Sequence, residues 1–154
     1  MKLHVGIRSN PLDGYVNIDP VPGQGKVLSG IENLDNHCHN NQCHKIIIDN
    51  VLNYIHWTKL AQVVSHYCSK LRHNAEITIL GTDLYEVIRN FYLGKIDSGQ
   101  LNSTMYGDGK DAWGFQYGVY DIETICSLLE KLNIKILKKE LHDNFQYTIV
   151  GIRN

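Results

Sequence analysis

Two residues near the start of the sequence have the types and the spacing that a nucleoside site needs. Gly6 ends a short apolar run, and Asp19 ends the next one along the chain. A glycine at the end of a strand lets a ligand approach the backbone, and a carboxylate at the end of the neighbouring strand accepts hydrogen bonds from ribose hydroxyls. Ordinary turns use the same residues, so both interpretations stay open on this pattern alone.

A loop rich in cysteine and histidine offers a different chemistry. Residues 37–44 have the sequence HCHNNQCH, in which histidine flanks both Cys38 and Cys43. Thiolate and imidazole are zinc ligands, but a closed zinc site needs four of them, usually as separated pairs. Those pairs are missing, so we interpret the segment as a polar connecting loop, assign no metal, and keep a structural metal site as an alternative. Cys68 and Cys126 are expected on buried helix faces.

Composition limits the class of protein. The chain has 154 residues, of which 43% are hydrophobic and 20% are charged, and this favours a single domain over residues 1–154. A formal charge of -1 provides no basic field for non-specific nucleic-acid binding or for an anionic membrane surface. No apolar run approaches the roughly 20 residues of a membrane span, and the start MKLHVG is unlike a secretory signal. We expect a cytoplasmic protein with reduced thiols.

The apolar pattern predicts the elements that must position these residues. Apolar residues at the period of a helix indicate an amphipathic helix within residues 57–72. Asp83 and Asp121 stand where the N-caps of two further helices are expected, and residues 94–120 are expected to be mainly irregular. Strands are predicted at residues 2–6, 15–19, 26–28, 45–48, 76–80, 134–137 and 147–152.

The order of these elements predicts the fold class. Strands that alternate with helices favour an α/β fold with a doubly wound, mostly parallel Rossmann-like sheet and helices on both faces. The short connection at residues 142–144 predicts an antiparallel C-terminal hairpin. Ligands of such sheets bind beyond the carboxyl ends of the strands, which is where Gly6 and Asp19 are expected.

Six sequence blocks add a family resemblance, namely residues 3–6, 12–19, 30–34, 46–55, 77–84 and 120–129. No single block is specific, but their order and spacing resemble a compact subgroup of class I S-adenosylmethionine-dependent methyltransferases over nearly the whole chain. The resemblance implies a class I methyltransferase fold and S-adenosylmethionine as the cofactor. It also implies cofactor contacts from six residues: Gly6, Ile7, Arg8, Asp19, Ile31 and Asp49.

The sequence departs from the pattern of that family at several positions. Arg8 stands where a second glycine is usual, Gly30 where an acidic residue often receives the adenine amino group, and His44 where the fourth strand usually opens with aspartate. Asn53 and Tyr54 replace a Glu-His pair. Arg8 either obstructs the pocket, turns outward, or pairs its guanidinium with the cofactor carboxylate.

The resemblance implies methyl transfer to a small-molecule or sugar-like acceptor. Such a reaction depends mainly on positioning and desolvation, so we assign no catalytic residue. If a base is needed, the candidates are Asp49, Tyr54, His56, Tyr106, Trp113, Gln116 and Tyr117, although for the aromatic ones lid or core packing is the favoured explanation. The departures favour one alternative, a methyltransferase-like binding or assembly subunit without turnover. The acceptor and the oligomeric state are not specified by the sequence.

Overall fold

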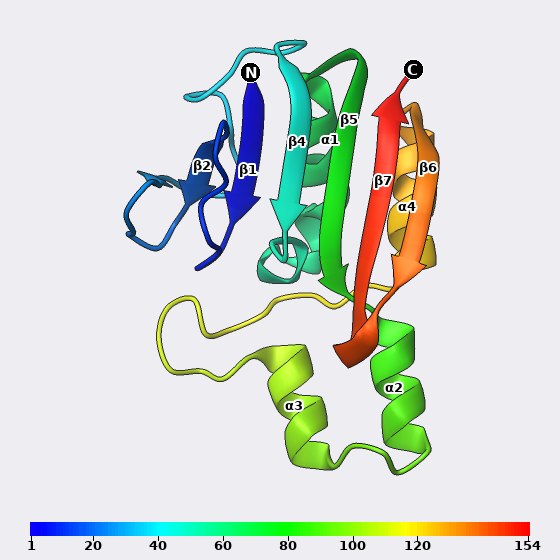
Figure 1. Cartoon of the computed structure of the whole chain (residues 1–154). Coiled ribbons are helices and arrows are strands. Elements are labelled where there is room, and N and C mark those ends of the chain that lie inside the picture. The colour runs from blue at the N-terminus through cyan, green and yellow to red at the C-terminus, as the bar shows by residue number, and fades with distance from the viewer.

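The computed structural model describes all residues from Met1 to Asn154 and contains one seven-stranded sheet (Figure 1). Its strands are β1 (Lys2–Gly6), β2 (Val16–Asp19), β3 (Val27–Leu28), β4 (Cys43–Asp49), β5 (Leu71–Thr82), β6 (Ile134–Leu141) and β7 (Gln146–Arg153). They lie in the order β3-β2-β1-β4-β5-β7-β6. Six strands run in one direction, and only β7 runs in the opposite direction. The order runs outward in both directions from β1 and β4, which confirms the doubly wound, mostly parallel sheet with an antiparallel C-terminal hairpin.

The helices are α1 (Leu60–Lys70), α2 (Leu84–Tyr92), α3 (Ser98–Tyr106) and α4 (Ile122–Lys131), with short 3-10 helices η1 (Leu52–Tyr54), η2 (Trp57–Lys59) and η3 (Asp143–Phe145). Both predicted N-caps are confirmed, because Asp83 accepts a hydrogen bond from the backbone of Glu86 and Asp121 from that of Thr124. The expectation of an irregular segment is wrong at α3. Asp97 and Gln100 form a capping box there, a sequence signal that indicates a helix start.

The two faces of the sheet are covered differently. Helices α1 and α4 lie against one face (Figure 1). The buried core cluster joins side chains of both helices to Val5, Ile48 and Ile77 of the strands. On the opposite face, Ile47 and Val150 are only half-buried. The expectation of helices on both faces is therefore wrong, because the connections between the first four strands are loops. No helix in the structure is both long enough and apolar enough to cross a membrane.

Candidate functional site

Three of the residues that the resemblance points to lie in one row at the ends of adjacent strands. Gly6 at the end of β1 is paired in register with Asp49 at the end of β4. Val5 is paired with Ile18 of β2, which places the next residue, Asp19, opposite Gly6. Because these strands are parallel, the row forms part of one edge of the sheet, the edge at which open α/β sheets bind ligands.

The chain turns sharply after β1, and Gly6 is required for that turn. A Cβ atom at Gly6 would lie 1.9 Å from Ser9 Oγ, so a larger residue would force Ser9 to move. Arg8 has a φ of 56°, a left-handed conformation that costs most residues roughly 1–2 kcal/mol and that glycine adopts freely. The position where the resemblance expects glycine therefore keeps a glycine-like backbone under an arginine side chain. Ile7, between them, packs against the core.

The Arg8 side chain contacts a segment far along the sequence. Its guanidinium forms an ion pair with Asp111, which lies between α3 and α4. The other oxygen of that carboxylate accepts a hydrogen bond from the backbone N–H of Trp113 at 2.9 Å. The hydrogen bond from Arg8, followed by that from Trp113, lowers the pKa of Asp111. Arg8 is thus already bound to a carboxylate of its own chain.

The same segment, residues 107–119, is anchored on η1. Asn53 donates from Nδ2 to Gln116 Oε1 at 3.1 Å, and its carbonyl oxygen accepts from the backbone N–H of Tyr117 at 2.7 Å. The rings of Tyr54 and Trp113 lie 6.3 Å apart at 55°. Burial raises the pKa of Tyr54. Three of the candidate bases, Tyr54, Trp113 and Gln116, are therefore brought together at this anchor.

A pocket of about 430 Å³ opens beside this aromatic pair. Its size is within the range of small-ligand sites. Ile31, which is 3% exposed, forms one wall, and the space next to the missing side chain of Gly30 is open. The eight lining residues are Ser29, Gly30, Ile31, Glu32, Asn33, Asn36, Tyr54 and Trp113. The pocket therefore joins the segment after β3, where the resemblance places the adenine, to segment 107–119.

Asp19 is covered by an ion pair within the protein. Lys26 Nζ lies 2.8 Å from Asp19 Oδ2, and the two side chains are only 10% and 1% exposed. The other Asp19 oxygen accepts a hydrogen bond from the backbone N–H of Val21 at 2.9 Å. A ribose therefore reaches this carboxylate only if the Lys26 side chain turns away.

Asp49 also belongs to a chain of side-chain contacts across β2, β1 and β4, formed by Asn17, His4 and Asp49. His4 donates from Nδ1 to Asn17 Oδ1 at 2.9 Å, and its Nε2 lies 3.4 Å from Asp49 Oδ2. Burial opposes the charged form of His4, but hydrogen bonds to Asp49 and Asn17 outweigh it and raise the pKa of His4. The hydrogen bond with His4 in turn lowers the pKa of Asp49. Asp49 thus faces a buried histidine, and the contact between them favours the charged form of each side chain.

Three further candidate bases, His56, Tyr106 and Tyr117, do not line the pocket. His56 accepts a hydrogen bond from the backbone N–H of Thr58 at 3.3 Å and caps η2. Tyr106 and Tyr117 are exposed side chains on segments beside the pocket rather than in its lining. The structure therefore gives them no partner that would activate them as bases.

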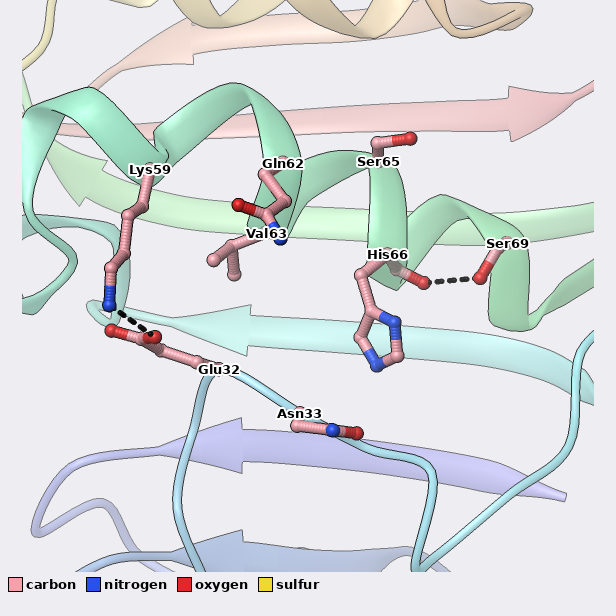
Figure 2. A pocket seen from close by; sticks show the side chains of 8 residues that line it. All are labelled: Glu32, Asn33, Lys59, Gln62, Val63, Ser65, His66 and Ser69. Atoms are coloured by element: carbon pink, nitrogen blue, oxygen red, sulfur yellow. Dashed lines mark hydrogen bonds and ion pairs between the residues drawn. The ribbon is translucent and has the colours of Figure 1, made fainter.

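A second pocket adjoins the first and has a different character (Figure 2). It has a volume of about 490 Å³ and lies between α1 and the segment that carries Glu32 and Asn33. Lys59 crosses its mouth to Glu32 at 3.3 Å, and Val63 is its one apolar side chain. Because this groove lacks aromatic or broad apolar walls, the pocket beside Ile31 suits a nucleobase better.

The cysteine and histidine loop does not assemble a metal site. Cys38 and Cys43 are buried with their thiols in contact, but no group of three or more His, Cys, Asp or Glu side chains lies close enough together to hold an ion. Burial raises the pKa of Cys43 to about 12, so its thiol stays protonated. His37 Nε2 lies 2.8 Å from Ser29 Oγ instead.

Two residues that define this site have no local signal in the sequence. Asp111 is separated from Arg8 by 103 positions, and Lys26 lies at the end of the loop between β2 and β3. A third, Asn17, lies in a recognised block, and only the register of β1 and β2 reveals its hydrogen bond to His4.

Solved structures of methyltransferases resemble this arrangement. 1,6-Didemethyltoxoflavin-N1-methyltransferase from Burkholderia thailandensis, with bound 1,6-didemethyltoxoflavin and S-adenosylhomocysteine, aligns over 91% of this chain and 61% of its own, at 10% identity and a TM-score of 0.61. A SAM-dependent methyltransferase from Archaeoglobus fulgidus aligns over 97% and 75%, at 13% identity and 0.56. Magnesium protoporphyrin IX methyltransferase from Synechocystis PCC 6803, with bound S-adenosylhomocysteine, aligns over 90% and 51%, at 10% identity and 0.54.

The chain has the class I methyltransferase fold. No protein-family model and no curated protein matches the sequence, so the likeness is one of structure. The chain spans 61% of the length of the toxoflavin methyltransferase and 51% of that of the porphyrin methyltransferase. Within the class I methyltransferase fold, the row from Asp19 to Asp49, the Arg8 turn and the Ile31 pocket all lie at the edge formed by the carboxyl ends of the parallel strands.

Proposed function

We propose that this chain is an S-adenosylmethionine-dependent methyltransferase that acts on a small-molecule or sugar-like acceptor. The observation that carries the proposal is the pocket between Ile31 and Trp113, which lies at the ligand-binding edge of a class I methyltransferase fold. Among the structures that share this fold, one holds bound 1,6-didemethyltoxoflavin and another is a magnesium protoporphyrin IX methyltransferase, which supports a small-molecule acceptor. The cytoplasmic location expected from the sequence stays a prediction.

The pocket and the residues at the adjacent strand ends together offer groups that suit the parts of this cofactor. Ile31, Tyr54 and Trp113 provide apolar and aromatic surface for the adenine ring. Arg8 provides a planar cation for the carboxylate, and Gly6 leaves the backbone accessible at the end of β1. Asp19 provides an acceptor for the ribose hydroxyls once Lys26 turns away. Asp49, whose carboxylate lies 3.4 Å from His4 Nε2, completes the row of strand ends.

When bound, the cofactor supplies a methyl group on a sulfonium sulfur. The task of the protein is then to orient the two reactants and to exclude water, which lowers the barrier without a dedicated catalytic residue. Segment 107–119 covers the pocket with Trp113 and carries Gln116 to Asn53. These contacts favour positioning as the main contribution of this chain.

Calorimetric titration with S-adenosylhomocysteine tests the proposal, and the two tryptophans of the chain provide a matched pair. Trp113→Ala removes a wall of the pocket, whereas Trp57→Ala removes an exposed ring outside it. Stacking of a base on an aromatic ring contributes about 1–3 kcal/mol, so Trp113→Ala should weaken binding about 5- to 150-fold. Trp57→Ala should leave it unchanged. Equal losses in both variants, or no binding by the wild type at millimolar ligand, would contradict the proposal.

One observation favours the alternative of a binding or assembly subunit without turnover. Arg8 and Asp19, the two charged groups best placed for the cofactor, are both bound to partners within the chain, Asp111 and Lys26. If these pairs persist in solution, neither Arg8 nor Asp19 is free to bind the polar parts of a nucleoside. Absence of S-adenosylhomocysteine binding by wild type would favour this alternative over methyl transfer.

A further inference from the structure

The carboxylate that Arg8 holds belongs to the protein, although the cofactor proposed above also carries one. We propose that Asp111 is a tethered competitor for the cofactor carboxylate, and that segment 107–114 moves off Arg8 when a ligand carboxylate takes its place. Asp111 is then a specificity-determining residue, because only carboxylate-bearing nucleosides release it. The inference rests on the proposed function and deepens it by naming the ligand group that the site selects.

The ion pair has the character of an exchangeable contact. The side chains of Arg8 and Asp111 are 43% and 51% exposed, so solvent and a ligand reach both of them. Exposed pairs of this kind contribute little to stability. A guanidinium binds any carboxylate in the same planar geometry, so a ligand carboxylate replaces the Asp111 contact with an equivalent one.

The left-handed turn at Arg8 keeps its side chain available to the carboxylate of Asp111 and to that of a ligand. Gly6 allows the chain to fold back on Ser9, and the positive φ of Arg8 is part of that turn. The turn follows β1 directly, next to the row of strand ends. Because the turn is braced against the end of β1, exchange of carboxylates moves the loop of Asp111 rather than Arg8.

Hydrogen bonds within segment 107–114 hold its backbone together, and the side chain of Trp113 packs against the core. Gly109 donates its backbone N–H to Gly114 at 2.9 Å, and Gly114 donates to the carbonyl oxygen of Asp111 at 3.0 Å. Gly107 at its start has a φ of 85°, a conformation that glycine adopts without strain. The next contacts, from Gln116 and Tyr117 to Asn53, lie outside this loop and hold its far end.

Release of Asp111 also changes the pocket wall. The Asp111 carboxylate that binds Arg8 also accepts a hydrogen bond from the backbone N–H of Trp113. The ring of Trp113 contacts Tyr54 and lines the pocket. Carboxylate exchange on Arg8 is thereby coupled to the position of the aromatic wall. A nucleoside without a carboxylate leaves Arg8 paired with Asp111, so its binding does not shift the aromatic wall through this contact.

The test compares two ligands that share the adenosine part. S-Adenosylhomocysteine carries a carboxylate, and 5′-methylthioadenosine does not. Calorimetry would measure both with wild type, Asp111→Asn, Arg8→Ala and the control Asp108→Asn. Asp108 lies in the same segment and pairs with Lys110, so its substitution makes the same change of charge without breaking the bond to Arg8.

Loss of the competitor should tighten S-adenosylhomocysteine binding by Asp111→Asn about two- to five-fold, the range expected for an exposed ion pair, and leave 5′-methylthioadenosine unchanged. Arg8→Ala should abolish the preference for the carboxylate-bearing ligand, and Asp108→Asn should behave as wild type.

Two results would overturn the inference, and they differ from each other. If wild type binds S-adenosylhomocysteine but Asp111→Asn binds it no better, or gains equally for 5′-methylthioadenosine, Asp111 does not compete for the carboxylate, while the proposed function stands. If no variant binds either ligand, the proposed function fails and the inference fails with it.

Discussion

Two ion pairs lie at the ligand-binding edge of the sheet, and they differ in burial. Asp19 and Lys26 are 1% and 10% exposed, whereas Asp111 and Arg8 are 51% and 43% exposed. Both join a cation and a carboxylate at the edge where open α/β sheets bind ligands. The first pair joins residues seven positions apart, and the second joins residues 103 positions apart.

The difference in burial indicates that one pair stabilises the fold and that the other can exchange its partner for a ligand. A buried charge that loses its partner has no water to replace it, so such a pair is costly to break. An exposed charge is solvated again at once, so its pair contributes little to folding and is open to competition by a ligand. We therefore expect the Asp19 pair to govern stability and the Arg8 pair to govern ligand choice.

Lys26→Met should produce the largest effect on stability. It keeps the apolar stem but leaves the Asp19 carboxylate buried without its cation, and loss of one partner of a buried pair costs about 3–5 kcal/mol. Urea unfolding would measure the loss. Lys59→Met is the matched control, because Lys59 forms an exposed pair with Glu32. Similar, small losses in both variants would show that burial does not distinguish the pairs.

His4 and Asp49 form a third pair of intermediate burial, with side chains 3% and 29% exposed. Because the pKa of His4 is raised above its ordinary 6.5, its protonated form stabilises the folded state. That contribution is fully present below about pH 6.5, the unfolded value, while Asp49 stays ionised, and it is lost as the pH rises through the folded pKa. Hydrogen bonds to charged groups contribute about 1.5–3 kcal/mol.

His4→Gln tests this pair, since glutamine retains hydrogen-bonding groups but does not titrate. The stability difference between wild type and His4→Gln should be largest near pH 6 and shrink at pH 9, measured by urea unfolding at each pH. His73→Gln serves as the control because that histidine is exposed on β5. A difference that grows towards alkaline pH would mean that His4 is neutral in the folded protein.

Much of this edge could be predicted because the signals are local. Apolar runs that end at Gly6 and Asp19 predict strand ends, and the N-caps at Asp83 and Asp121 are set by side chains that bond within one helical turn. The capping box of α3 is an equally local signal, carried by the spacing of Asp97 and Gln100, and the expectation of an irregular segment overlooked it. These features depend on a few consecutive residues.

The partners of the site residues could not be predicted, because they depend on the assembled sheet. The residue type at Arg8 gives no sign that its backbone keeps a left-handed conformation or that its partner is Asp111. The pairing of His4 with Asn17 requires the register of β1 and β2. Long-range charge pairing follows from topology, and the sequence supplies only the charges.

Gly6→Ala would sharpen the comparison by moving the turn that carries Arg8. The new methyl group would lie 1.9 Å from Ser9 Oγ and 2.7 Å from Ser9 Cβ, an overlap that typically costs about 1–3 kcal/mol. Thermal unfolding should report the loss, and Ser9→Gly in the same chain should restore most of it by removing both atoms. If the double variant is no more stable than Gly6→Ala, the clash lies elsewhere in the turn.

Arg8→Ala should produce the smallest effect on stability of all. Both partners of its ion pair are exposed to water, so the melting temperature should stay at the wild-type value while the preference for S-adenosylhomocysteine is lost. Asp111→Asn should behave likewise in unfolding, although it acts on binding in the opposite direction. Melting curves and calorimetry on the same preparations would separate the two properties. A drop comparable to that of Lys26→Met would mean that the Arg8 pair holds the fold together, and a contact that holds the fold is not free to exchange with a ligand.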